Sequence, residues 1–384
     1  MKKLYSPKTI KLIQDLYGFK FTKSLGQNFL VDKNFVDKII DLSEVSGENI
    51  LEIGPGIGTI SQEMAKTCKK LVLIEIDRTL IPILNDNLGE FSNVDIINAD
   101  ILKTDLKKIV KENFSGEDFK VVSNLPYYIT TPIIEKLFEE DLPCKDMTIM
   151  VQKEVADRMK ADEKSKDYSS LSVFIKYYSE ITGQFKVPKS VFMPQPKIDS
   201  QVLKLNLRLY DENVDTNTLF NIVRAGFNKR RKTILNSLSS VIEKEDLKEI
   251  LQNLSLKENL RAENLSLDDF INIANEYEKI KSLNWKRLSF EYNNDVRKID
   301  LNKKIGENMK KVTIYTSNTC PHCKAAKNYL KENNIDFEEK NVDEDRSAID
   351  YLVENGHRGV PVINIDGEDI VGFNKEIVDE KLGL

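Results

Sequence analysis

The chain has 384 residues, with 57 Lys and Arg against 62 Asp and Glu, two His and four Cys. This length suits two or three domains, and 40% hydrophobic with 31% charged residues is typical of a folded globular protein. No apolar run is long enough to span a bilayer and no secretory signal is recognised, so we expect a cytoplasmic protein without a membrane partner. Both histidines, His322 and His357, lie in the last quarter, which excludes a histidine-dependent nucleophile or a His-ligated metal from the first three quarters.

Five short segments rich in β-branched residues alternate with segments of helical spacing, the pattern of a parallel sheet covered on both faces. We expect strands at 49–53, 71–76, 94–97, 120–123 and 147–151. The segment 201–207, in which polar and apolar residues alternate, is predicted to be an edge strand.

Helical spacing then replaces the strand pattern between 216 and 278, and a second strand–helix alternation runs from 311 onwards. The predicted organisation is α/β at 1–210, a small all-α lobe at 211–280, a linker at 281–308, and a separate domain at 309–384.

A glycine turn, Glu52-Ile-Gly54-Pro-Gly56-Ile-Gly58, follows the first predicted strand. A dinucleotide fingerprint would need glycine where the chain has Thr59, so an adenosyl ligand without pyrophosphate fits better. Glu75 and Asp100 end the next two strands, where they could accept hydrogen bonds from ribose hydroxyls and from an adenine amino group. The turn alone is compatible with a simple tight turn, but the two carboxylates favour a ligand site.

The motif Asn124-Leu125-Pro126-Tyr127 follows the fourth predicted strand. The exocyclic amine of adenine is a poor nucleophile because its lone pair is delocalised into the ring. The Asn124 amide oxygen and a backbone carbonyl near Leu125 or Pro126 could accept both N–H protons and favour a tetrahedral nitrogen. Tyr127 offers a ring for stacking of an extruded base. The alternative interpretation is a plain Asn-x-Pro turn.

In this order the motifs resemble class I S-adenosylmethionine-dependent methyltransferases, and more specifically the bacterial small-subunit (16S) rRNA adenine N6,N6-dimethyltransferase family. The similarity covers residues 10–280. It rests on the stretches 25–30, 52–58, 124–132, 151–155, 192–200, 227–233 and 261–266.

This resemblance implies a Rossmann-like methyltransferase sheet with a helical RNA-binding lobe, and it implies site residues. Those for the S-adenosyl-L-methionine cofactor are Asn28, Leu30, Gly54, Gly56, Glu75, Asp100 and Asn124. Those at the reacting base are Asn124, Leu125, Pro126, Tyr127 and Phe192, with Phe192 stacking on the base opposite Tyr127. No metal is expected.

The resemblance further implies double methylation of two adjacent adenosines in a hairpin loop near the 3′ end of small-subunit rRNA. The partners would be this rRNA and the pre-small-subunit ribosomal particle, bound by a monomer. One alternative is the related large-subunit rRNA methylase group that confers macrolide resistance. Another is a ribosome-assembly factor without catalysis.

A run of positive charge in the lobe is predicted to lie in one helix and to contact RNA phosphates. Its members are Arg224, Lys229, Arg230, Arg231 and Lys232. The alternative interpretation is an ordinary solvated helix face.

Near the C-terminus, Cys320 and Cys323 form a Cys-x-x-Cys motif at the start of a predicted helix. A helix N-terminus stabilises a thiolate, so Cys320 is predicted to attack and Cys323 to resolve the mixed disulfide. Residues 309–384 resemble a glutaredoxin-like domain with the thioredoxin fold, Pro361 being the cis-proline beside the dithiol. The implied co-substrate is glutathione or another thiol reductant. Gly372-Phe-Asn374 departs from the family's glutathione contact, and half of a zinc site is the alternative.

Overall fold

The chain folds into two compact units, Met1–Arg287 and Leu288–Leu384, each of which is described by itself. The computed structural model describes residues 2–22, 25–140, 142–208, 210–211, 213–298, 312–318, 320–333, 335–357 and 359–382.

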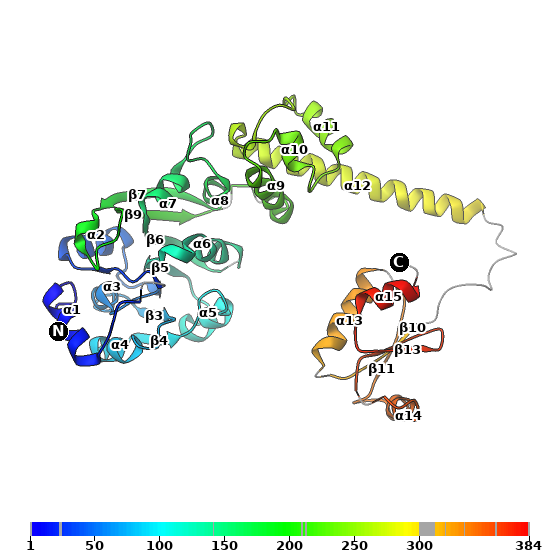
Figure 1. The fold of residues 1–384 in the computed structure, drawn as a ribbon, viewed down its shortest axis with the longest axis horizontal. Coiled ribbons are helices and arrows are strands. Elements are labelled where there is room, and N and C mark those ends of the chain that lie inside the picture. The colour runs from blue at the N-terminus through cyan, green and yellow to red at the C-terminus, as the bar shows by residue number, and fades with distance from the viewer. Residues whose placement is uncertain are drawn as a thin grey trace. The chain divides into compact units, whose positions relative to one another are not determined.

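A seven-stranded sheet forms the centre of the first unit (Figure 1), in the order β4-β3-β2-β5-β6-β9-β7. Its strands are β2 (Asn49–Ile53), β3 (Lys70–Glu75), β4 (Val94–Asn98), β5 (Phe119–Asn124), β6 (Cys144–Gln152), β7 (Ser179–Val187) and β9 (Ser200–Leu207). The first five are parallel, while β9 and β7 are antiparallel. The five predicted parallel strands are therefore confirmed, and the order is that of a class I methyltransferase.

Helices cover both faces of this sheet, because successive strand residues point to opposite sides. Ile50 belongs to the cluster that includes α2 and α3, whereas Leu51 belongs to the cluster that includes α5 and α6. The helices of this part are α1 (Pro7–Tyr17), α2 (Lys33–Ser43), α3 (Thr59–Met64), α4 (Ile81–Leu88), α5 (Leu106–Phe114), α6 (Thr130–Glu139), α7 (Lys153–Lys160) and α8 (Ser170–Tyr178).

The prediction that 201–207 is an edge strand is wrong. This segment, β9, lies between β6 and β7, and β7 forms the edge. Gln201 and Lys204 made the segment look solvent-facing, but both are buried and bonded, Gln201 to Gln184 and Lys204 to Glu44.

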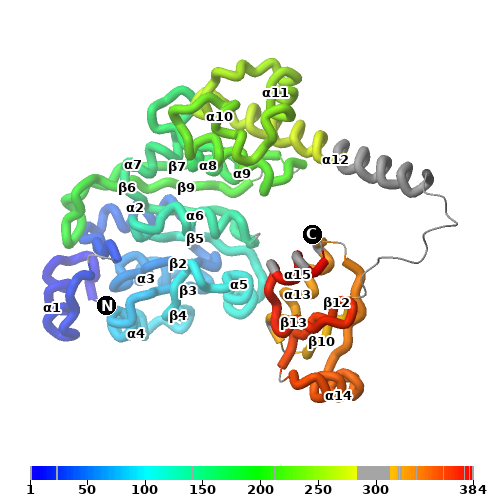
Figure 2. Tube along the Cα trace, turned by 45° about the vertical axis from the view of Figure 1, so that its right-hand side comes forward, coloured from blue at the N-terminus to red at the C-terminus, as the bar shows by residue number. Residues whose placement is uncertain are grey.

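The all-α lobe is confirmed. Its helices come after the strands of the sheet along the chain, and Figure 2 shows them grouped together. They are α9 (Thr216–Asn228), α10 (Ile234–Leu238), α11 (Lys244–Asn253) and α12 (Leu267–Lys298), with the 3-10 turn η4 (Ala262–Asn264) between the last two. Two further 3-10 turns, η2 (Tyr127–Ile129) and η3 (Lys189–Val191), lie in the sheet domain. Helix α12 extends into the segment 281–308 that is predicted as a linker. The rest of that segment, from 299, lies outside the described residues.

The second unit has a four-stranded sheet in the order β11-β10-β12-β13, with β10 parallel to β11 and the other pairs antiparallel. Its elements are β10 (Val312–Thr316), α13 (Pro321–Glu332), β11 (Glu338–Asn341), α14 (Arg346–Glu354), β12 (Val362–Ile365), β13 (Glu368–Val371) and α15 (Lys375–Leu382). This is a thioredoxin-like fold, as predicted.

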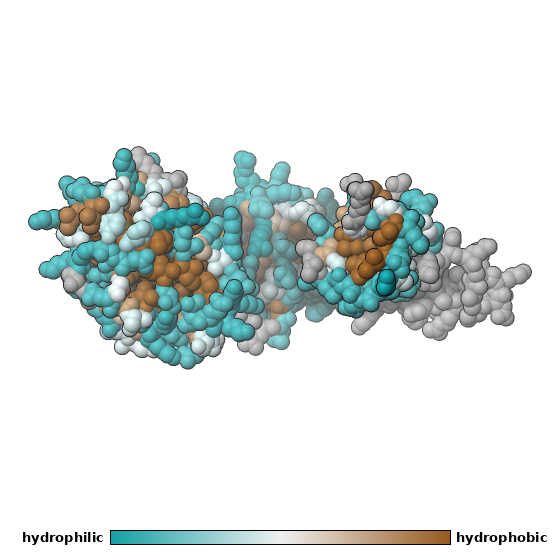
Figure 3. Space-filling model, turned by 90° about the horizontal axis from the view of Figure 1, so that it is seen from below, coloured by the Kyte–Doolittle hydropathy of each residue, from teal (hydrophilic) through white to brown (hydrophobic). Residues whose placement is uncertain are grey.

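The face shown in Figure 3 is mainly hydrophilic, with hydrophobic side chains gathered in limited areas. One area lies on the second unit, where α14 carries the exposed Ile349 and Val353. Within the described parts of the chain, no helix is long and apolar enough to cross a membrane.

Candidate active site and dithiol site

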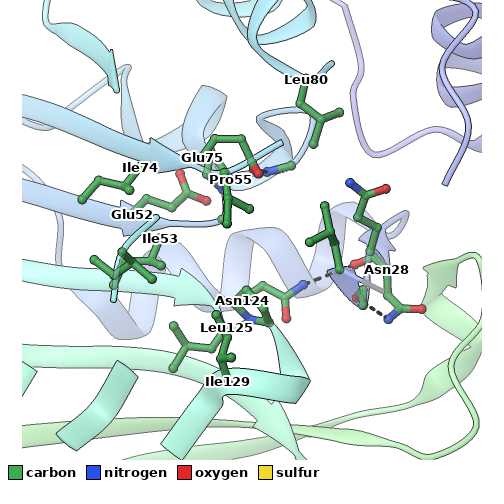
Figure 4. A pocket seen from close by; sticks show the side chains of 18 of the residues that line it. Asn28, Glu52, Ile53, Pro55, Ile74, Glu75, Leu80, Asn124, Leu125 and Ile129 are labelled. Atoms are coloured by element: carbon green, nitrogen blue, oxygen red, sulfur yellow. Dashed lines mark hydrogen bonds between the residues drawn. The ribbon is translucent and has the colours of Figure 1, made fainter. Parts of the chain in front are cut away.

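A cavity opens at the carboxyl ends of β2, β3 and β5, and its space, together with the open solvent at its mouth, amounts to about 910 Å³. It lies where the strand order reverses between β2 and β5, the usual ligand position in open α/β sheets. Of the residues predicted for cofactor and base, all except Phe192 line it. Their side chains come from separate strands and loops (Figure 4).

The glycine turn forms one wall of the cavity, between β2 and α3. Gly54 and Gly56 both have positive φ, 68° and 64°, a conformation that favours glycine. A side chain at Gly56 would also collide with the ring of Phe29, which would lie 2.7 Å from the added Cβ. The turn therefore keeps its shape only with glycine at this position.

Two carboxylates lie beside this turn. Glu75 accepts hydrogen bonds from the backbone N–H groups of Gly56 at 3.2 Å and Asp77 at 2.9 Å. Burial raises the pKa of Glu75 to about 7. Glu52, whose carboxylate accepts from the Ser61 hydroxyl, is buried more deeply, and burial raises its pKa to about 8. At neutral pH the negative charge in this wall is therefore only partial.

Asp100, which follows the end of β4, lines the same cavity. One of its oxygens accepts from the Leu102 N–H at 3.0 Å, and the other lies 3.7 Å from the Lys103 ammonium. Its side chain is 29% exposed, so it retains room to accept a further hydrogen bond.

Asn124 ends β5 with its amide held in one orientation. Its Nδ2 donates to the backbone oxygen of Asn28 at 3.2 Å, while its Oδ1 is buried and has no hydrogen-bond partner. Figure 4 shows this contact, and the Asn28 side chain in turn donates to the Gly26 oxygen. A second buried oxygen in the cavity wall, Thr59 Oγ1, also lacks a partner. Buried polar atoms are normally bonded, so both indicate a polar ligand.

The residues after Asn124 form the mouth of the cavity. Tyr127 is half-buried, and its hydroxyl lies 2.7 Å from the Ser200 hydroxyl. Pro126 O accepts both the Ile129 N–H at 3.2 Å and the Thr130 hydroxyl at 3.0 Å. Of the two carbonyls considered from the sequence, Leu125 is therefore the one left to accept from a ligand.

Phe192 does not reach the cavity. It lies in the short strand β8 (Phe192–Met193), which pairs with β1 (Phe29–Leu30) so that Phe192 is opposite Leu30. Its side chain is only 4% exposed, in the cluster that contains Val36. The β1–β8 pairing thus places the ring in a hydrophobic cluster and not in the cavity wall, and its stacking on the base stays a prediction.

In the second unit, Cys320 caps the N-terminus of α13 and forms a disulfide with Cys323. Cys320 Sγ accepts the Cys323 N–H at 3.1 Å and lies 3.5 Å from the Val360 oxygen, next to the cis peptide bond of Pro361. Cys323 is 1% exposed, whereas Cys320 is partly accessible. Cys320 is therefore the more accessible of the two sulfurs. In the described residues no group of three or more His, Cys, Asp or Glu side chains could hold a metal ion.

The family model "Ribosomal RNA adenine dimethylase" matches residues 18–279. The chain belongs to the ribosomal RNA adenine dimethylase family. "Ribosomal RNA small subunit methyltransferase A" of Alkaliphilus oremlandii is 48% identical over 287 residues, which are 73% of this chain and 99% of the relative. The protein of that name from Clostridioides difficile is 46% identical over 281 residues, 72% of this chain and 97% of its own.

A solved dimethyladenosine transferase from Plasmodium falciparum matches the dimethylase part with 26% identity and a TM-score of 0.56. The match covers 65% of this chain and 98% of that one. The glutaredoxin family model matches residues 312–370, within the second unit. The protein is thus an adenine dimethylase carrying a glutaredoxin-like domain.

The basic run of the dimethylase lobe is not in one helix, contrary to prediction. Helix α9 ends at Asn228, and residues 229–232 form a turn closed by the Lys232 N–H on the Lys229 oxygen.

The five cations of this run divide into two groups. Arg224 pairs with Glu139 at 2.9 Å, and Arg230 donates to the backbone oxygens of Lys166 and Tyr168. Lys229, Arg231 and Lys232 are exposed, and in the described part of the dimethylase no ion pair involves them. We name these three residues the basic turn.

Among the cavity residues that were not predicted from the sequence, Thr59, Tyr128 and Gln27 carry polar groups. Thr59 served only to reject a dinucleotide fingerprint, although its position beside the glycine turn was a usable signal. Tyr128 is half exposed at the cavity mouth, and its pKa is raised by burial and then by Asp100 and Glu75. Gln27 connects the N-terminal segment to the sheet, since it accepts from Thr22 N–H and donates to Asp77. No local pattern marks that contact.

Proposed function

We propose that this enzyme dimethylates N6 of two adjacent adenosines in a hairpin loop near the 3′ end of small-subunit rRNA, and thereby takes part in small-subunit biogenesis. The observation that carries the proposal is the buried, unpartnered Oδ1 of Asn124 beside the carboxylate-lined cavity. An acceptor without a partner at this place matches an N–H donor on a substrate. The two relatives named as small-subunit methyltransferases match this chain over almost their whole length, which is consistent with this substrate.

The residues of the cavity fit S-adenosyl-L-methionine. The cavity wall carries two buried oxygens without a hydrogen-bond partner, Asn124 Oδ1 and Thr59 Oγ1, next to the glycine turn. Glu75 and Asp100 would accept from ribose and adenine, while Asn28, Leu30, Gly54 and Gly56 would enclose the rest. When bound, this cofactor supplies a methyl group on a positively charged sulfur.

The chain's own residues would prepare the amine for transfer. In the first transfer, Asn124 Oδ1 accepts a hydrogen bond from one N6–H and the Leu125 carbonyl accepts one from the other, which turns the nitrogen lone pair towards the methyl group. Tyr127 stacks on the base. After transfer the nitrogen is positively charged and loses a proton to water, so no general base is required from the protein.

Parallel incubations of labelled cofactor with small subunits and with large subunits, both from cells without the enzyme, test the proposal. We expect label in two adjacent adenosines of small-subunit rRNA, located by mass mapping. Label only in the large subunit would favour the macrolide-resistance type of methylase. RNA binding without label would favour a non-catalytic assembly factor. We also propose that the enzyme acts as a cytoplasmic monomer on the pre-small-subunit particle, which sedimentation of the bound complex checks.

Cofactor binding is predicted to depend on the ionisation of Glu75. Because burial raises the pKa of Glu75 to about 7, its carboxylate loses acceptor strength as the pH falls through that value. Affinity for S-adenosylhomocysteine, measured by calorimetry, should be constant above about pH 8 and fall about tenfold towards pH 6. Glu75→Gln should bind weakly at every pH. If Glu75→Gln kept the wild-type pH profile, another group would be titrating, the first candidate being Glu52 with a pKa of about 8.

RNA affinity is predicted to depend on the basic turn. Replacing Lys229, Arg231 and Lys232 with alanine removes three exposed cations. We expect the slope of log affinity against log salt to become shallower by about 2, since each phosphate contact contributes about 0.7–0.9. Filter binding of a small-subunit rRNA hairpin at several salt concentrations measures this slope.

Two controls separate phosphate contact from other effects. Lys107→Ala with Lys111→Ala removes two exposed cations from α5 and should leave the slope unchanged. Arg230→Ala should lower thermal stability instead, because its guanidinium holds the backbone at 166–168. An equal change of slope in all three variants would show that the basic turn makes no specific phosphate contact and contributes only to the general positive charge.

We propose that the glutaredoxin-like domain is a dithiol–disulfide oxidoreductase led by Cys320. Its reductant would be glutathione or another thiol. Comparing the rate of disulfide reduction with glutathione and with a thioredoxin system would distinguish these two.

A further inference from the structure

The strongest unassigned contact at the site joins two motifs that are far apart in the sequence. The Tyr127 hydroxyl lies 2.7 Å from the hydroxyl of Ser200, 73 residues further along the chain. Either oxygen can act as donor. Burial raises the pKa of Tyr127, so its hydroxyl remains protonated and the bond persists across the working pH range.

Ser200 is a rigid anchor. Its residue is 1% exposed and begins β9, where it is paired on both sides, with Gln152 of β6 and Val187 of β7. Tyr127, in contrast, lies in the short turn η2 and is half-buried. The fixed partner in this hydrogen bond is therefore Ser200, and the residue being held is Tyr127.

Tyr127 lies at the cavity mouth, so its ring can receive a base only if rotation of the side chain is restricted. A side chain held at its backbone and at its hydroxyl keeps the long axis of its ring in one direction, whereas a side chain held only at its backbone can swing about χ1 across the cavity mouth. Pre-organised contacts accelerate a reaction because the ordering cost is met before the substrate arrives.

We propose that Ser200 is a positioning residue for methyl transfer, which holds the long axis of the Tyr127 ring at the place where the extruded adenine stacks. This inference rests on the proposed function. Ser200 acts through Tyr127 and touches neither the base nor the cofactor. Its loss should therefore lower turnover, kcat, while leaving the dissociation constant of the cofactor unchanged.

A double-mutant cycle tests the proposal with purified full-length enzyme and unmethylated small subunits. Ser200→Ala and Tyr127→Phe each delete one hydroxyl of the pair, and Tyr127→Phe keeps the ring. We expect each to lower kcat by about threefold to tenfold, the worth of one hydrogen bond. The double variant should be no slower than either single variant. Cofactor affinity, by calorimetry, should stay within twofold of wild type in all three.

Ser179→Ala is the matched control, since Ser179 is another buried serine at a strand start of the same sheet, bonded to the Ile175 oxygen. It should keep wild-type kcat even where its melting temperature falls as much as that of Ser200→Ala. Wild-type kcat in Ser200→Ala, or additive losses in the double variant, would overturn the inference alone. A wild-type enzyme that transfers no methyl group would overturn the proposed function and this inference with it.

Discussion

Asn124→Ala is expected to slow methyl transfer by about 10²–10³-fold, the usual cost of removing one hydrogen-bonding group aimed at a reacting centre. The physical reason is the fixed orientation of the amide. Because Nδ2 is held by the Asn28 oxygen, Oδ1 is available only to a donor within the cavity. Single-turnover label transfer to small subunits measures the change. Cofactor affinity should fall only a few-fold, since Glu75 and Asp100 remain.

Asn124→Asp is the informative companion to this variant. It keeps an acceptor oxygen but replaces the donor to the Asn28 carbonyl with a second oxygen, which that carbonyl repels. Its activity should therefore lie between those of Asn124→Ala and wild type. Near-wild-type transfer by Asn124→Ala, with the fold intact by thermal unfolding, would show that the amine is activated by other groups.

Cys320→Ser should reduce thiol–disulfide exchange to the uncatalysed background, while Cys323→Ser should still form the first mixed disulfide. Cys320 is the accessible sulfur, and in the reduced protein the Cys323 N–H and the start of α13 would stabilise its thiolate. In Cys323→Ser, alkylation of Cys320 should titrate with a midpoint below about 8.5, the value of a free cysteine.

Stopped-flow alkylation between pH 4 and 10 measures this midpoint, and mass spectrometry identifies the mixed disulfide. The buried cysteines Cys68 and Cys144 provide an internal comparison, because burial raises the pKa of each thiol. They should react slowly at every pH in this range. An ordinary midpoint for Cys320 would remove the basis for its role as the attacking sulfur.

Local sequence was sufficient wherever chemistry depends on residues close together in the chain. The glycine turn, the carboxylates of Glu75 and Asp100, and the Asn124–Tyr127 motif all line one cavity. The reason is that parallel strands present their carboxyl ends at one edge of a sheet, so the strand pattern already implies this proximity. The dithiol at the start of α13 was predictable because its two cysteines are only three residues apart in the chain.

Only the tertiary structure decided which distant segments meet. Periodicity identifies a strand but not its neighbours, so it misassigned the edge strand and could not show that β9 carries Ser200 to the hydroxyl of Tyr127. The pairing of β1 with β8 places Phe192 in the hydrophobic core, which its local motif does not show. Charge counting likewise could not separate Arg230, which is bonded to the backbone of the dimethylase sheet domain, from the basic turn beside it. A local pattern reports what a residue can do, whereas long-range pairing determines the partner with which it does it.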